Sequence, residues 1–239
     1  MGIRKSQSSL KPNEWADLID AIDKIHQNGA VAPKYQDFVQ IHIQAMAMNN
    51  PTGLAWGVHT MQGMSGMQGS DGRNFLSWHR EYLAKFEQRL QKVHPNVTIP
   101  YWDWSVDRKI PPQLSNPNDL ARWNVKRYGP SGKLPSLSAI KKVKQQKTFN
   151  AFQSLIERTI HGTVHDFVGG GGDMSHNNSP NDPIFWLHHA NIDRLWDEWQ
   201  NTHSGMNPSN MNEILKPSPI ITGNVSDVQH ISSLGYSYA

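Results

Sequence analysis

Two histidines one helical turn apart are the first feature of this sequence that could carry chemistry. His161 and His165 stand at positions i and i+4 in the segment HGTVH. On a helix this spacing places both imidazoles on one face, so that two ring nitrogens can converge on one ion. Zinc proteases share the spacing, but a glutamate follows their first histidine, whereas Gly162 stands there in this chain. The plain alternative is a pair of surface histidines.

Further histidines favour a metal centre. His188 and His189 are adjacent in a later helical segment, and their side chains differ by about 100° around the helix axis, so only one is expected to face the ion bound by the first pair. Neutral imidazoles suit copper, zinc or iron, and copper binds most tightly among the divalent choices. The first half of the chain offers a second set of three histidines: His42, His59 and His79. Two such sets on four helices would form a binuclear centre.

The elements that must position these histidines are predicted to be helices. Apolar residues recur at helical spacing, usually ended by glycine or proline, over the segments 14–29, 34–48, 75–93, 149–168 and 184–203. Residues 105–145 and the tail from 204 onward are expected to be mostly loop. No repeat and no linker divides the chain. We therefore predict a mainly α fold, with one domain over 1–239 and metal ligands projecting from facing helices.

Composition excludes several other classes of function. The 239 residues include no cysteine, which rules out disulfides, thiolate zinc sites and cysteine nucleophiles. Without a run of about 18 apolar residues, we expect no membrane span and a soluble protein. The net charge is +3, and the basic residues form one cluster, KKVKQQK at 141–147. We interpret this cluster as a solvated helix face or loop, because no nucleic-acid motif accompanies it. The N-terminus lacks the apolar core of a secretory signal, which leaves the compartment open.

Several motifs resemble those of tyrosinases and related type 3 copper proteins, which include catechol oxidases and molluscan haemocyanins. The motifs are FLSWHREYL, IPYWDW, HGTVHDFVGG and SPNDPIFWLHHANIDRLWDEW, and the resemblance covers nearly the whole chain. It implies a four-helix bundle, surrounded by long loops, that holds two copper ions on three histidines each. The chain would be a short catalytic core of the bacterial or archaeal type, without a C-terminal shielding domain.

The resemblance also implies a reaction. Members of the family oxidise phenolic small molecules with O2 to o-quinones, so we expect a tyrosinase or catechol oxidase and no nucleic-acid partner. A haemocyanin-like carrier that binds O2 reversibly at the same coppers is one alternative, and an o-aminophenol oxidase is another. The oligomeric state is left open.

Carried across by position, the resemblance assigns three histidines to each copper: His42, His59 and His79 to the first, and His161, His165 and His189 to the second. His189 is preferred because the family ligand lies seven residues after the aspartate of the DP motif, here Asp182, so His188 is expected to pack beside the site. Most members have their second ligand a short turn before the FLPWHR-like segment, where this chain has Ser70. We therefore assign His59 and treat MQGMSGMQGS as an insertion.

Two carboxylates are candidates for proton transfer. Glu157 resembles the acid that holds a water in tyrosinase sites, and its alternative is a carboxylate on a helix surface. The asparagine that shares this water in enzymes with strong monophenol activity is replaced by Gly162, which has no side-chain amide. Asp166 directly follows His165 and could take a proton or orient a cationic amine. We expect rapid diphenol oxidation and slower monophenol hydroxylation.

Three methionines precede the FLSWHREYL motif: Met61, Met64 and Met67. Thioethers are soft ligands that suit Cu(I), although loop methionines are more often inert. We hypothesise that they capture Cu(I) and pass it to the first site through His59.

The two ends of the sequence also match in chemistry. Arg4 resembles the N-terminal partner of the tyrosine motif in LGYSYA. We expect its guanidinium to lie over the ring of Tyr236 or Tyr238 in a cation–π contact.

Overall fold

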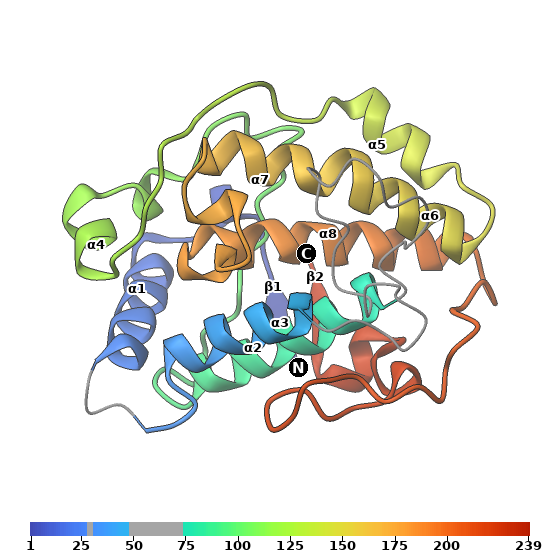
Figure 1. Ribbon diagram of the computed structural model, residues 1–239, viewed down its shortest axis with the longest axis horizontal. Coiled ribbons are helices and arrows are strands. Elements are labelled where there is room, and N and C mark those ends of the chain that lie inside the picture. The colour runs from blue at the N-terminus through green and yellow to red at the C-terminus, as the bar shows by residue number, and fades with distance from the viewer. Residues whose placement is uncertain (28–30, 48–73) are drawn as a thin grey trace.

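The computed structural model describes residues 1–27, 31–47 and 74–239. Within these residues the fold is mainly α-helical, as predicted (Figure 1). His59, Met61, Met64, Met67 and Ser70 lie outside the described residues, so the hypotheses about them stay predictions.

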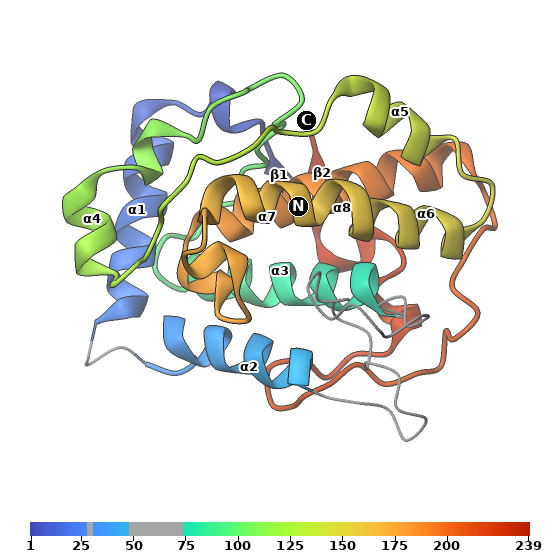
Figure 2. The same ribbon diagram turned by 45° about the horizontal axis from the view of Figure 1, so that its top comes forward.

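Four helices carry histidines of the predicted centre: α2 (Tyr35–Ala47), α3 (Phe75–Gln91), α7 (Gly162–Gly169) and α8 (Ile184–Thr202). Of these, α2, α3 and α8 run roughly along the long axis of the molecule (Figure 1). Figures 1 and 2 show α7, α8, α3 and α2 following one another across the molecule, which confirms the helical bundle. The histidine-bearing helices therefore come from both halves of the sequence and meet in the interior.

The two central helices are α3 and α8, which pack directly against each other. Both bury side chains on nearly every face, whereas the outer helix α1 (Pro12–His26), which lies across the long axis of the molecule (Figure 1), has one buried stripe. Phe86 of α3 stacks face to face on Trp186 of α8, with ring centroids 3.6 Å apart. Large aromatic side chains thus provide much of the packing that holds these helices in register.

The segment around His161 is not one uninterrupted α-helix, which corrects the prediction over 149–168. The structure has α6 (Phe149–Leu155), then a π-helical turn over Ile156–His161, then α7. The N–H of Gly162 donates to the carbonyl of Glu157, five residues back. A π-helical turn contains one more residue than an α-helical turn, so the side chains that follow it change direction. Such turns are common at functional sites.

Residues 105–145 contain two short helices, α4 (Pro117–Arg122) and α5 (Leu137–Lys144), where mostly loop was expected. The Ser136 hydroxyl caps α5 by accepting a backbone N–H of its first turn, and Ile140 and Val143 point into the core. The lysines of α5 face mainly toward solvent, which confirms the interpretation of the basic cluster as a solvated helix face.

Short elements close the remaining connections. The chain ends pair as two parallel strands, β1 (Gly2–Arg4) and β2 (Tyr236–Tyr238). Single 3-10 turns lie at Gln7–Ser9, Pro112–Leu114, Asp173–Ser175, Ser179–Asn181, Val225–Val228 and Ile231–Leu234. Of the helices in the described ranges, none has both the length and the apolar character needed to cross a membrane.

The contact predicted between the chain ends is confirmed. The guanidinium of Arg4 lies 3.6 Å from the centroid of the Tyr236 ring and donates to the Tyr238 hydroxyl at 3.2 Å. Arg4 is completely buried, and it also donates to Glu87 at 2.9 Å and to Asp193 of α8 at 3.5 Å. The ends of the chain are therefore joined to α3 and α8 through one buried charge network.

Candidate metal centre

Four buried histidines gather between α7 and α8: His161, His165, His188 and His189. One ring nitrogen from each lies within 4.8 Å of the others. The π turn delivers the first, α7 delivers the second one turn later, and α8 delivers the adjacent pair. The helical spacing of the first pair is confirmed by its ring centroids, which are 4.4 Å apart. The alternative of two surface histidines is wrong, because both are at most 8% exposed.

The second predicted set lies against this cluster. His42 of α2 and His79 of α3 are 0% and 2% exposed, and their ring centroids are 5.8 Å apart. The ring of His79 stacks on that of His189 at 4.1 Å, so the two sets adjoin across the α3–α8 contact. The structure thus brings together five of the six histidines assigned from the sequence, and the sixth, His59, lies outside the described residues.

Backbone carbonyls orient the rings of three of these histidines. In each case the Nδ1–H donates to a carbonyl oxygen: His42 to Asn177 (2.8 Å), His79 to Phe75 (2.8 Å) and His165 to Met174 (2.6 Å). A neutral imidazole that donates from Nδ1 keeps the lone pair on Nε2, which is the arrangement of metal-ligating histidines. The Nε2 atoms of His165 and His189 lie 3.3 Å apart, so ligand atoms converge on a common point.

Burial keeps these imidazoles neutral. It lowers the pKa of His42 to about 3 and that of His165 to about 4, from an ordinary value of 6.5. It also lowers the pKa of His79, His188 and His189 well below that value. Since metals bind the neutral ring, the site is in its ligating form at neutral pH.

His188 differs from its neighbours in its hydrogen bond. The indole N–H of Trp104 donates to Nδ1 of His188 at 3.1 Å, and both residues are fully buried. The lone pair of this neutral ring is therefore already in use, and Nε2 carries the proton. His188 lies inside the cluster by distance, but this hydrogen bond favours a packing role. Sequence reasoning missed Trp104, whose motif IPYWDW was the available signal.

The candidate carboxylates lie in different surroundings. Glu157, in the π turn before His161, is 3% exposed, so it is not a helix-surface carboxylate. Asp166 is exposed on α7, and within the described part of the chain its carboxylate makes no hydrogen bond or ion pair. Its backbone carbonyl accepts from the Ser131 hydroxyl at 3.2 Å.

Comparisons with known proteins agree on one family. The sequence matches the common central domain of tyrosinase over residues 32–134 and 115–202. It is 30% identical to a tyrosinase of Streptomyces glaucescens, over 86% of this chain and 85% of that protein. The fold superposes on a functional unit of octopus haemocyanin with a TM-score of 0.76 and 26% identity, covering 100% of this chain and 68% of that one. It also superposes on a Vitis vinifera polyphenol oxidase with a TM-score of 0.73, covering 100% and 85% of the two chains.

Proposed function

This chain belongs to the tyrosinase family, and we propose that it oxidises phenolic small molecules with O2 to o-quinones at a binuclear copper centre. The observation that carries the proposal is the convergence of buried, neutral imidazoles from α2, α3, α7 and α8 on one interior region. An all-imidazole donor set of this kind fits copper. When bound, the copper pair would supply the activation of O2 and the electron transfer.

We assign the ligands as the sequence predicts: His42, His59 and His79 for one copper, and His161, His165 and His189 for the other. The carbonyl-bound Nδ1 atoms of His42, His79 and His165 support this assignment, because a neutral ring that donates from Nδ1 has its lone pair on Nε2. The Trp104 hydrogen bond supports leaving His188 out of the set.

The chain's own carboxylates would handle the phenolic proton. Glu157 is buried in the turn directly before His161, where a carboxylate could hold a water against the site. Gly162 offers no amide to share this water, so we expect the proton of a monophenol to be removed inefficiently. Asp166 is exposed and would act at the mouth, where it could accept a proton or attract a cationic amine. Diphenols need less of this help, so we propose that they are the faster substrates.

Two rival functions remain open to the same site. The superposition on a haemocyanin functional unit supports reversible O2 binding as the second candidate. An o-aminophenol oxidase would use the same centre on a closely related substrate. A carrier would bind O2 without consuming it, whereas either oxidase would consume O2 continuously.

The test is a substrate panel on copper-loaded protein, with O2 uptake and quinone absorbance recorded together. We expect continuous uptake with catechol, a lag with tyramine, and lower rates with o-aminophenol. O2 binding without turnover would favour the carrier, and a preference for o-aminophenol would favour the other oxidase.

Two variants test the proton-transfer roles. Gly162→Asn should raise the ratio of monophenol to diphenol rates by up to about tenfold, and Asp166→Ala should lower it. If neither substitution changes the ratio, the assignment of these positions is wrong even if the chain is a phenol oxidase.

A further inference from the structure

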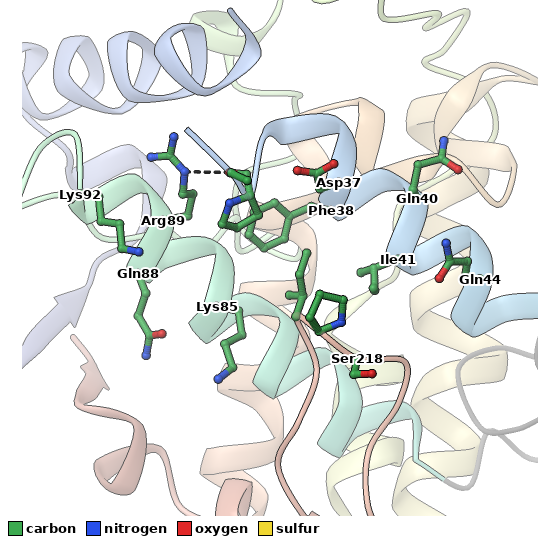
Figure 3. A pocket seen from close by; sticks show the side chains of 14 residues that line it. Asp37, Phe38, Gln40, Ile41, Gln44, Lys85, Gln88, Arg89, Lys92 and Ser218 are labelled. Atoms are coloured by element: carbon green, nitrogen blue, oxygen red, sulfur yellow. Dashed lines mark hydrogen bonds between the residues drawn. The ribbon is translucent and has the colours of Figure 1, made fainter. Parts of the chain in front are cut away.

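A groove of about 720 Å³ lies on the outer side of α2 and α3, away from the histidine cluster. Figure 3 shows that one side is formed by α2, the other by the second half of α3, and that the segment around Ser218 crosses below them. Its accessible apolar lining includes Pro33, Pro219 and Ile220, whereas Phe38 and Ile41 of α2 are buried behind it. The volume falls within the range of about 300–1,000 Å³ that is typical of small-molecule sites.

The α3 side of the groove is cationic. Lys85, Arg89 and Lys92 follow one another at positions i, i+4 and i+7, so all three lie along one side of the helix (Figure 3). Asp37 is the one carboxylate among the described residues that line the groove. One of its oxygens already accepts the N–H of Lys34 at the start of α2, at 2.7 Å. Lys85 is paired with Glu81 of its own helix, with Nζ 3.8 Å from Oε1. Arg89 and Lys92 therefore carry the excess of positive charge beside the apolar lining of the groove.

Arg89 is the residue that most strongly indicates a missing anion. It is 7% exposed, yet within the described residues no carboxylate lies at ion-pair distance from it. Its Nε and Nη2 donate only to neutral backbone carbonyls, those of Pro33 at 2.8 Å and Val31 at 3.0 Å. Burial lowers the pKa of Arg89, which reflects the same lack of a compensating charge.

The other deeply buried arginines behave differently. Arg4 contacts Glu87 at 2.9 Å, and Arg80 contacts Asp193 of α8 at 2.5 Å. Both are 0% exposed and both have a carboxylate partner. Buried charges are normally paired in this way, because an isolated ion is costly to remove from water. Arg89 departs from that pattern beside a groove that could hold its partner.

We propose that this groove is a binding site for a small aromatic anion, a ring-bearing carboxylate or sulfonate. The ring would lie on an apolar floor formed by Pro33, Pro219 and Ile220. The anionic group would face the cationic side of α3, within reach of the charge of Arg89 and the flexible ammonium group of Lys92. Gln40 and Gln88, which also line the groove, offer amide donors.

Isothermal titration calorimetry of the copper-loaded protein with 2-naphthalenesulfonate tests the site. We expect saturable binding at one site per chain that weakens as salt is added. Two matched probes divide the contributions: sulfate carries the charge without the ring, and 2-naphthalenemethanol carries the ring without the charge. Both should bind more weakly than the sulfonate. Equal binding of the neutral probe would overturn the role of the cations, and equal binding of sulfate would overturn the role of the floor.

Variants locate the binding. Substituting Arg89 risks loosening the Val31–Pro33 backbone, and Lys85 is paired with the buried Glu81, so the test uses the exposed Lys92. Lys92→Glu should raise the dissociation constant by about threefold. Lys141→Glu, on α5 at the other side of the molecule, makes the same change at another exposed lysine and should leave the dissociation constant unchanged. Unchanged binding in Lys92→Glu would place the anion elsewhere and refute the proposal, whatever the outcome of the phenol assays.

Discussion

Trp104 gives a physical reason for choosing between two adjacent histidines. The motif spacing favoured His189 as a ligand, but spacing alone does not say what His188 does instead. The indole N–H of Trp104 donates to Nδ1 of His188, whereas Nε2 of His189 faces that of His165. One hydrogen bond from a different part of the chain therefore distinguishes the expected role of His188 from that of His189.

Removing that indole should disturb the ligand set. In Trp104→Phe, Nδ1 of His188 loses its donor, so the ring can change tautomer and offer Nε2 to the metal. We expect a changed nitrogen splitting in the Cu(II) electron paramagnetic resonance spectrum of protein loaded with one copper per chain. Trp102→Phe is the control, because this equally buried indole donates to the Asp107 carbonyl instead, at 2.8 Å. Both variants should lose about 1–3 kcal/mol of stability, so identical spectra would contradict the role of Trp104.

The buried imidazoles predict how the copper-free protein responds to acid. The folded pKa is about 3 for His42 and about 4 for His165, against 6.5 in the unfolded chain. Between these values the unfolded chain binds protons that the folded chain does not. Stability is therefore complete above pH 6.5 and falls as the pH decreases, by up to about 1.4 kcal/mol per unit for each histidine.

Urea unfolding of the copper-free protein at a series of pH values measures the effect. A series from about pH 4.5 to about pH 7.5 covers the range in which stability falls. A His42→Gln variant should show a shallower dependence, because one buried titrating group is gone. A flat profile in the original chain would mean that the rings are already solvated without metal.

The helices that carry the histidines could be predicted because their apolar residues recur with helical period. The π turn before His161 could not, since its residues also suit an ordinary α-helix and the extra residue shows only in the backbone hydrogen bonds. The helices α4 and α5 were missed because their surroundings are polar, and the burial of Ile140 and Val143 depends on tertiary contacts. The carbonyls that orient His42 and His165 come from loops whose course no local pattern specifies.

The end of α7 depends on a glycine at a close backbone approach. Gly170 has a φ of 54°, and a Cβ there would lie 2.6 Å from the backbone nitrogen of Gly129. Gly171 also has a positive φ, 92°, but an added Cβ would meet nothing within 4 Å. Gly171→Ala should therefore cost only the conformational penalty of about 1 kcal/mol. Gly170→Ala adds a steric clash and should cost about 3 kcal/mol. Denaturant unfolding compares the stability of the two variants. Equal losses of stability would show that the backbone at Gly129 moves aside freely.

The buried network at the chain ends should contribute more to stability than any surface ion pair. Arg4→Ala removes a fully buried cation that contacts Glu87 and Asp193, so we expect a loss of about 3 kcal/mol or more. Its neighbour Lys5 pairs with Glu14 at 2.6 Å, but both side chains are about one third exposed. Lys5→Ala should cost less than about 1 kcal/mol. Equal melting temperatures for the two variants would refute the importance of the network.

The pairing of β1 with β2 also sets an order in time. A ribosome makes Gly2–Arg4 long before Tyr236–Tyr238, and at cellular rates of synthesis the interval is on the order of tens of seconds. During that interval the Arg4 guanidinium has neither Asp193 nor its tyrosine ring, and an unpaired cation stays in water. Strand β1 therefore pairs with β2 late, after α8 and the histidines that it carries have been made. Pairing of β1 with β2 is therefore the meeting of two segments that are made far apart in time.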